Sequence, residues 1–232
     1  MSAAVEKQMS DSFRLGAVLA LAGGFLDAYS YCVRGGVFAN AETGNMVLLG
    51  IHAVRGNWAA ALGYLVPVLA FAAGVLAAEL IRSRETERSA FHWRQRSILL
   101  ELCVLIVVAF LPQRWNTAAN VAVSFVCAVQ VESFRKLGGS AFATTMCTGN
   151  LRSGTERLYR WRRSGDRAAG RQAAQYYGII LCFILGAALG AQVSIRLRER
   201  AVLAAAVLLL GAFLMMFREK SPSSNRDIDG QA

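Results

Sequence analysis

The amino-acid sequence predicts an all-α integral membrane protein. Of its 232 residues, 55% are apolar and 17% charged, whereas a soluble domain is roughly 45–50% apolar and about 25% charged. Several apolar runs approach twenty residues, the length that a helix needs to cross a bilayer. The 25 basic residues exceed the 15 acidic ones, but they lie mostly outside these runs. This pattern favours a membrane protein over a nucleic-acid binder, so we expect no nucleic-acid partner.

Six stretches are apolar enough to span the lipid bilayer: residues 13–33, 59–81, 97–112, 117–135, 173–195 and 201–217. The bilayer is therefore a predicted partner of the chain. The third and sixth lie at the short end of the usual range, about 17 residues. What remains is too short for a second domain. We therefore expect one transmembrane domain over residues 13–217, flanked by tails at residues 1–12 and 218–232.

The basic residues predict the orientation, because cytoplasmic loops retain Lys and Arg. With the N-terminus inside, 19 of the 25 basic residues lie on the cytoplasmic side. Both tails are therefore expected in the cytoplasm. The leader carries Glu6 and Asp11 against Lys7, which favours a retained first span over a cleaved signal peptide.

An internal repeat divides the chain into residues 13–112 and 117–217. The first block, Gly35-Gly36, Phe38-Ala39 and Thr43-Gly44-Asn45, recurs as Gly138-Gly139, Phe142-Ala143 and Thr148-Gly149-Asn150. Later matches pair Phe71-x-x-Gly74-x-x-x-Ala78 with Phe183-x-x-Gly186-x-x-x-Gly190, and Ala109-Phe110-Leu111 with Ala212-Phe213-Leu214. Because each half has three spans, the second enters the membrane inverted, as in secondary transporters and channels. A duplicated scaffold without transport is the alternative.

The stretch after the first span is apolar yet begins and ends on one side, which predicts a re-entrant hairpin. A helix over residues 45–56 would return from mid-membrane with Thr43 as its N-cap. The second copy would enter from the cytoplasmic face, with Thr148 as the cap and a helix that ends near Arg160. Alternatively, both segments cross fully and the chain has eight spans.

Two re-entrant turns would meet near mid-membrane and present free N–H groups and positive helix ends. We therefore expect the solute to bind at these turns, which are formed by Thr43, Gly44, Asn45, Thr148, Gly149 and Asn150.

Polar residues inside the apolar spans are the next candidates, because a charge in lipid is costly and is usually functional. Asp27 and Gln130 each lie eight residues before a Gly-Gly pair, and Glu132 follows closely. We expect Asp27 and Gln130 to line the site, and Asp27 or Glu132 to titrate with transport. Alternatively, they form a buried hydrogen-bonded pair between the halves. For Glu79 and Glu101, solvated ion pairs with nearby arginines are the simpler explanation.

Small residues form two seams that permit close helix packing, Gly74 with Ala78 and Gly186 with Gly190. Because the seams are repeat partners, we expect them to meet at the pseudo-twofold axis, with a homodimer interface as the alternative. The five cysteines are scattered among apolar residues, and the two histidines lack ligand neighbours. We therefore expect neither a metal site nor a cofactor.

The motif Gly23-Gly24-Phe25-Leu26-Asp27-Ala28, followed by Val37-Phe38-Ala39-Asn40 and Thr43-Gly44-Asn45, resembles the bacterial YoaK-like membrane family. In the second half, the resemblance continues through Gln130, Arg135-Lys136, Gly138-Gly139 and Thr148-Gly149. Ala128 replaces a family glycine, and Val131-Glu132 replace Asn-Ala. The resemblance implies a six-span inner-membrane protein of unknown function, and brings no substrate or catalytic residue.

These observations favour a secondary transporter of a small polar or anionic solute, working by alternating access around the two Thr-Gly-Asn turns. A passive channel with the same hairpins and a non-transporting membrane scaffold are the alternatives. We expect no enzymatic activity, because the sequence has no recognisable nucleophile–base pair, metal-ligand cluster or phosphate-binding loop.

Overall fold

The computed structural model describes residues 13–83, 93–134, 145 and 147–217, and this part of the chain consists of helices and their short connections. The α-helices are α1 Phe13–Val33, α2 Glu42–Val54, α3 Trp58–Ser83, α4 Trp93–Val108, α5 Asn116–Ser133, α6 Cys147–Ser164, α7 Arg167–Leu197 and α8 Val202–Phe217. Two short 3-10 turns, η2 Gln113–Trp115 and η3 Arg198–Ala201, join α4 to α5 and α7 to α8. The all-helical prediction is confirmed over the described residues, and every predicted span overlaps a helix, although the third, residues 97–112, runs past the end of α4 at Val108.

Three segments are long and apolar enough to cross a bilayer: Phe13–Val33, Trp58–Ser83 and Arg167–Met216, the last of which runs through α7, η3 and α8. Helices α4 and α8 are shorter, at 16 residues each. Length and composition therefore support a membrane protein without establishing all six predicted crossings.

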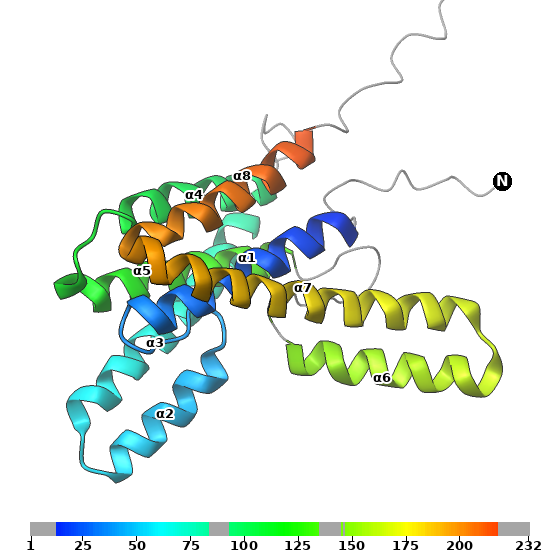
Figure 1. Cartoon of the computed structure of the whole chain (residues 1–232), viewed down its shortest axis with the longest axis horizontal. Coiled ribbons are helices and arrows are strands. Elements are labelled where there is room, and N and C mark those ends of the chain that lie inside the picture. The colour runs from blue at the N-terminus through cyan, green and yellow to red at the C-terminus, as the bar shows by residue number, and fades with distance from the viewer. Residues whose placement is uncertain (1–12, 84–92, 135–144, 146, 218–232) are drawn as a thin grey trace, which may run out of the picture.

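The helices pair in a pattern that relates the two halves of the chain. Helix α1 packs along α7, and α3 along α5; α2 lies beside α3, and α6 beside α7. The remaining pairs are α4 with α5, α1 with α8, and α4 with α8. Figure 1 shows the α2–α3 and α6–α7 hairpins projecting from different sides of a central group formed by the other helices. Exchanging α1–α4 with α5–α8 reproduces this set of pairs.

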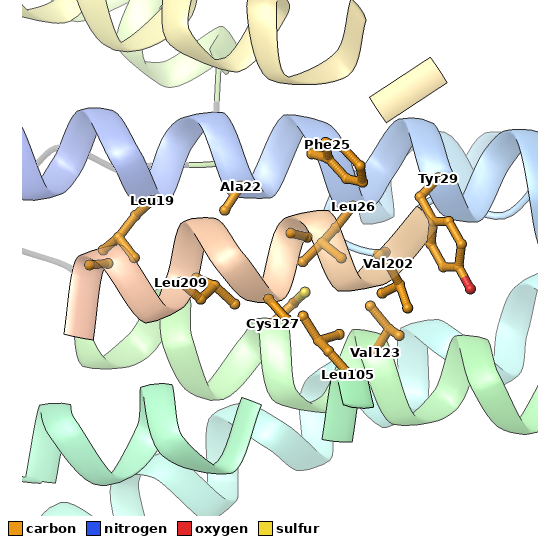
Figure 2. Packing of buried hydrophobic residues seen from close by; sticks show 14 of the residues in the cluster. Leu19, Ala22, Phe25, Leu26, Tyr29, Leu105, Val123, Cys127, Val202 and Leu209 are labelled. Atoms are coloured by element: carbon orange, nitrogen blue, oxygen red, sulfur yellow. The ribbon is translucent and has the colours of Figure 1, made fainter. Parts of the chain in front are cut away.

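Helix α1 is the centre of the packing. Of its candidate span, 67% is buried, against 17% for α3. Figure 2 shows Leu26 and Tyr29 of α1 near Val202 of α8, with Leu105 of α4 and Val123 of α5 beside them. These residues form one buried apolar cluster, so α1 carries its polar side chains into the interior of the protein.

Glycines bring the helix backbones into direct contact. A side chain at Gly24 would overlap the carbonyl of Phe183, and one at Gly186 would overlap the carbonyl of Leu21. In the other pair, one at Gly74 would overlap the carbonyl of Phe125. Only a residue without Cβ permits this approach, and close packing is the main attraction between helices in lipid.

The two small-residue seams do not have the partners that we expected. Gly74 packs on α5, while Gly186 and Gly190 pack on α1, so each seam contacts a helix of the other half rather than the other seam. The seam of α7 packs on the first span, where Gly24 leaves a smooth surface. The seam of α3 packs on the fourth span, where the small residue is Ala128. All four seam residues are buried within the chain, so they are not available for a homodimer interface.

Two further glycines form the turns that connect a short helix to the long helix that follows it. Gly56 (φ 71°) follows α2, and Gly165 (φ 68°) follows α6. The N–H of each glycine donates to a carbonyl of the preceding helix, Ala53 at 3.0 Å and Trp161 at 2.9 Å. This left-handed helix ending favours glycine, and it occurs at matching places in the two halves.

The α1–α7 contact gives a testable prediction for stability. The substitution Gly186→Ala places a methyl group against the backbone of Leu21, and overpacking of this kind costs about 1–3 kcal/mol. We expect a lower thermal unfolding temperature for the detergent-purified protein. The matched control is Gly211→Ala in α8, where nothing lies within 4 Å of the added carbon. An equal loss of stability in both variants would contradict the close contact.

Candidate functional site

Asp27 joins α1 to the start of α2. Its side chain is 4% exposed, and its Oδ1 accepts hydrogen bonds from the backbone N–H groups of Asn40 at 2.7 Å and Ala41 at 3.2 Å. These residues immediately precede α2, so the carboxylate lies at the positive end of that helix. An acidic side chain from another helix thus satisfies N–H groups at the start of α2.

The predicted N-cap is therefore wrong. Residue Ala41 occupies the N-cap position of α2 and makes no side-chain capping bond, while Thr43 lies inside the helix and is exposed. The sequence pattern favoured Thr43 because its hydroxyl is a common cap. Instead, the carboxylate of Asp27, 14 residues before Ala41 in the sequence, accepts the hydrogen bond from the N–H of Ala41.

Asn45 fastens the chain that leads into α2. Its Oδ1 accepts from the N–H of Phe38 at 2.9 Å, and its Nδ2 donates to the carbonyl of Phe38 and to Oε2 of Glu42, both at 2.8 Å. Gly44 leaves room for the ring of Phe38, which a Cβ would approach to 2.8 Å. The first Thr-Gly-Asn motif therefore holds its own connection, and only Asn45 of the three is buried.

The second Thr-Gly-Asn motif resembles the first in burial, because its asparagine is buried and its threonine is exposed. Thr148 and Gly149 are exposed on α6, and Asn150 is 2% exposed. The residue that reaches the centre from this half is Thr145, which is 7% exposed. A side chain at Gly23 of α1 would touch the methyl group of Thr145 at 2.7 Å and Nδ2 of Asn40 at 3.8 Å. Thr145 and the approach to α2 therefore meet beside α1. Gly138 and Gly139 lie outside the described residues.

Glu42, which the sequence analysis did not select, is the second carboxylate at this place. It is 8% exposed, and it lies near Asp27 and the Ser124 hydroxyl of α5. An acidic residue at the start of the predicted half-helix was the available signal, because carboxylates favour helix N-termini. Asp27, Asn40, Glu42, Ser124 and Thr145 are hereafter called the central cluster.

Gln130 and Glu101 form a second buried pair beside the central cluster, since Cys127, which contacts Glu101, also lies near Asn40. Gln130 donates through Nε2 to Oε2 of Glu101 at 2.7 Å, and the thiol of Cys127 lies 3.9 Å from Oε1. Glu101 is 0% exposed, so the prediction of a solvated ion pair is wrong for this residue: its helix face meets α5 rather than water. The same prediction is confirmed for Glu79, which pairs with Arg82 at 3.3 Å on the surface.

The structure places Glu132 away from the carboxylates of the central cluster. Its Oε1 lies 3.9 Å from Arg82, at the end of α5, with 11% of the side chain exposed. This contact favours an ion pair over the predicted coupling role, and it leaves Asp27 as the candidate for coupling.

Arg34, which directly follows the predicted first span, is 1% exposed. Its guanidinium donates to the hydroxyl of Tyr29 at 2.8 Å, the carbonyls of Val108 and Leu111 at 2.8 Å, and the side chain of Asn116 at 3.2 Å. Its own carbonyl accepts from Asn120 at 2.8 Å. Arg34 thus ties the end of α1 to the end of α4 and the start of α5, and a cation is favourable at the end of α4.

The described residues hold no group of three or more His, Cys, Asp or Glu side chains that is arranged to bind a metal ion. The central cluster combines two carboxylates with an amide and two hydroxyl groups, a set of neutral and acidic oxygens. It is therefore unlike a transition-metal centre, which usually uses imidazole or thiolate ligands.

The clamp at Asn45 is open to a stability test. The substitution Asn45→Ala removes three hydrogen bonds, and a buried group left unsatisfied costs about 1–3 kcal/mol. We expect a clear fall in thermal stability in detergent. Asn57→Ala is the control, because Asn57 accepts one exposed bond, from Ala60 at 3.3 Å. If the two variants unfold at the same temperature, the clamp does not stabilise the protein.

The chain belongs to the family described as protein of unknown function (DUF1275), which matches residues 15–215. It is also similar to the UPF0700 transmembrane protein YoaK of Bacillus subtilis (strain 168), with 27% identity over 140 residues. That match covers 59% of this chain and 62% of the relative, less than two thirds of its length. No solved structure matches. The predicted YoaK-like family is therefore confirmed, and the chain is a transmembrane protein.

Proposed function

We propose that this protein is a secondary transporter that moves a small polar solute across the bacterial inner membrane by alternating access. The observation that carries the proposal is the central cluster, where the approach to α2 and Thr145, just before α6, meet beside α1. Non-helical backbone at membrane depth is tolerated where it is buried in protein or lines a wet cavity. Residues 34–41 have this character, since Val37, Ala39 and Asn40 are buried.

The proposed architecture has six spans in two inverted repeats, with α2 and α6 as re-entrant half-helices. Three observations support it: the reciprocal helix pairs, the backbone contacts of Gly74 and Gly186, and the turns at Gly56 and Gly165. Each of them relates an element of one half to its counterpart in the other. Central binding at the interface of such repeats recurs in secondary transporters.

The geometry favours a polar solute over the anion that we also expected. The positive end of α2, where an anion would bind, already holds the carboxylate of Asp27. A second negative group beside Asp27 and Glu42 would be repelled. We therefore propose that the solute is small and polar but not anionic.

The proposal includes no catalytic step and no cofactor. The alternatives remain a passive channel with the same hairpins and a scaffold that binds no solute. A homodimer would require a surface other than the buried glycine seams. Under the proposed orientation, both tails are cytoplasmic, the turn after α2 faces the outside and the turn after α6 faces the inside.

This orientation predicts one-sided labelling of two turns. Single cysteines are introduced as Arg55→Cys and Ser164→Cys, both at exposed positions, after replacement of the five native cysteines. An impermeant thiol reagent should label the first only in right-side-out vesicles and the second only in inside-out vesicles. Labelling of both from the same side would overturn the inverted re-entrant arrangement.

Alternating access predicts that the centre opens to each side in turn. In the same cysteine-free protein, Thr145→Cys should react with the impermeant reagent in both vesicle orientations. Leu105→Cys, in the apolar core, should react in neither. A scaffold would leave the cysteine at position 145 unreactive from both sides.

The contacts of Arg34 separate a transporter from a channel. Asn116→Ala removes one hydrogen bond from Arg34. A loss of about 1.4 kcal/mol would shift the equilibrium between the inward-open and outward-open states tenfold toward the outward-open state. In a transporter, the cysteine at position 145 should react faster from the outside and correspondingly more slowly from the inside. Arg34→Ala should shift both rates further. In a channel, the substitution at the outer end of the bundle would not slow the reaction of the cysteine at position 145 from the inside.

A further inference from the structure

In the described part of the chain, five buried oxygen atoms of the central cluster have no hydrogen-bond partner: Oδ2 of Asp27, Oδ1 of Asn40, Oε1 of Glu42, Oγ of Ser124 and Oγ1 of Thr145. Each belongs to a side chain that is at least nine-tenths buried. Buried polar atoms in proteins are nearly always satisfied. Five such atoms in one cluster therefore indicate a ligand or ordered water at this place.

The side chains that carry these atoms come from several segments of the chain. Asp27 and Asn40 are linked by the 2.7 Å hydrogen bond, and Glu42 follows two residues later. Thr145 and Asn40 both lie against Gly23, while Ser124 faces Glu42. The amide nitrogen of Asn40 donates to the carbonyl of Gly23 at 3.3 Å, which directs its Oδ1 away from that bond. The cluster thus draws its side chains from α1, the start of α2, α5 and position 145.

The free atoms can all accept hydrogen bonds, and the two carboxylates form no ion pair with the basic residues that the structure describes. The carboxylates and the amide oxygen only accept hydrogen bonds, and the two hydroxyl groups can accept as well. In the described part of the chain, no lysine or arginine forms a salt bridge with Asp27 or Glu42. Buried carboxylates are costly unless they are paired or bind a cation. An anion would supply further acceptors and worsen this imbalance.

We infer that the central cluster binds a small cation through oxygen ligands, a deduction that rests on the proposed function. Carboxylate, amide and hydroxyl oxygens match hard cations such as the alkali and alkaline-earth ions. A primary ammonium group carries positive charge and three N–H donors, so it offers the same chemistry from an organic solute. The cation is then either the coupling ion or the charged end of the solute.

Glu101 provides the matched control for this inference. It is also a fully buried carboxyl group, but both of its oxygens have neighbours, Gln130 and Cys127. The substitution Glu101→Gln removes a buried negative charge of the same kind without removing a free acceptor. Binding of a cation at the central cluster should therefore persist in this variant.

The test measures thermal unfolding of the full chain in detergent or nanodiscs. The starting buffer contains N-methyl-D-glucamine chloride, whose cation is too bulky for the cluster, and ionic strength is kept constant. Separate titrations add sodium, potassium, calcium, magnesium or methylammonium chloride. At a hundredfold excess over Kd, the effective cation should raise Tm by about 5–10 °C with saturation.

Variants of the cluster establish where the cation binds. Glu42→Gln and Ser124→Ala should each weaken the apparent affinity at least tenfold, while Glu101→Gln should leave it near the wild-type value. Ser124→Ala removes a hydroxyl group that has no partner, so this variant should fold even if a carboxylate variant does not. Equal Tm shifts in the wild type and in both cluster variants would overturn the site.

The titrations also separate the two sources of positive charge. Saturation by a metal ion alone assigns an inorganic ion, and saturation by methylammonium alone assigns the end of an organic solute. If no cation shifts Tm while the cysteine at position 145 reacts from both sides, the cation site is wrong and the transporter proposal stands. If a cation binds but that cysteine reacts from neither side, the transporter proposal is wrong and the site is structural.

Discussion

The carboxylate of Asp27 holds the connection before α2 against the middle of α1, and the arrangement of the site depends on this contact. One oxygen accepts from two consecutive N–H groups that would otherwise be unsatisfied. Because α1 is the most buried of the three candidate spans, the start of α2 is brought to the interior rather than to the surface. The same bond neutralises the positive end of α2, and among the described residues the second oxygen of Asp27 has no hydrogen-bond partner. Fold and site chemistry therefore depend on a single side chain.

Arg34 is the counterpart of Asp27 at the end of α1. A guanidinium group inside an apolar bundle is tolerated when its donors are satisfied, and here two of the four acceptors are carbonyls at the end of α4. Tyr29 extends the contact to η3, since its hydroxyl donates to the carbonyl of Glu199 at 3.1 Å. This end of the bundle is thus closed by hydrogen bonds that involve α1, α4, α5 and η3. A polar closure of this kind can be broken and remade at modest cost, unlike the backbone contacts of Gly24 and Gly186, which fix α1 to α7.

Apolar run length placed every predicted span on a helix, because in lipid the backbone must satisfy its own hydrogen bonds and helices do so locally. Partners that come from distant segments could not be predicted in this way. Glu101 and Gln130 are 29 residues apart, and nothing in their local sequence predicts that they meet. The same is true of Arg34 and Leu111, which are 77 residues apart. Asp27 was identified because a charge in an apolar run is unusual in itself, whereas Glu42 lay in a segment that was assigned to a turn. The Thr43 cap failed for a related reason, since local sequence cannot show that another helix supplies the carboxylate.

The two halves agree in packing and differ in charge. The close glycine contacts and the glycine turns occur in both, as the proposed repeat requires, because equivalent helices must approach and turn in equivalent ways. The carboxylates of the central cluster, however, come only from the first half, where Asp27 and Glu42 correspond to Gln130 and Cys147 of the second. Two full sets of carboxylates near one axis would place four negative charges together, and their repulsion in a medium of low dielectric would be severe. Only neutral oxygens from the second half, such as the hydroxyl of Thr145, are compatible with the pair supplied by the first. A symmetric packing frame therefore surrounds an asymmetric polar centre, and the two carboxylates of that centre suit a cation.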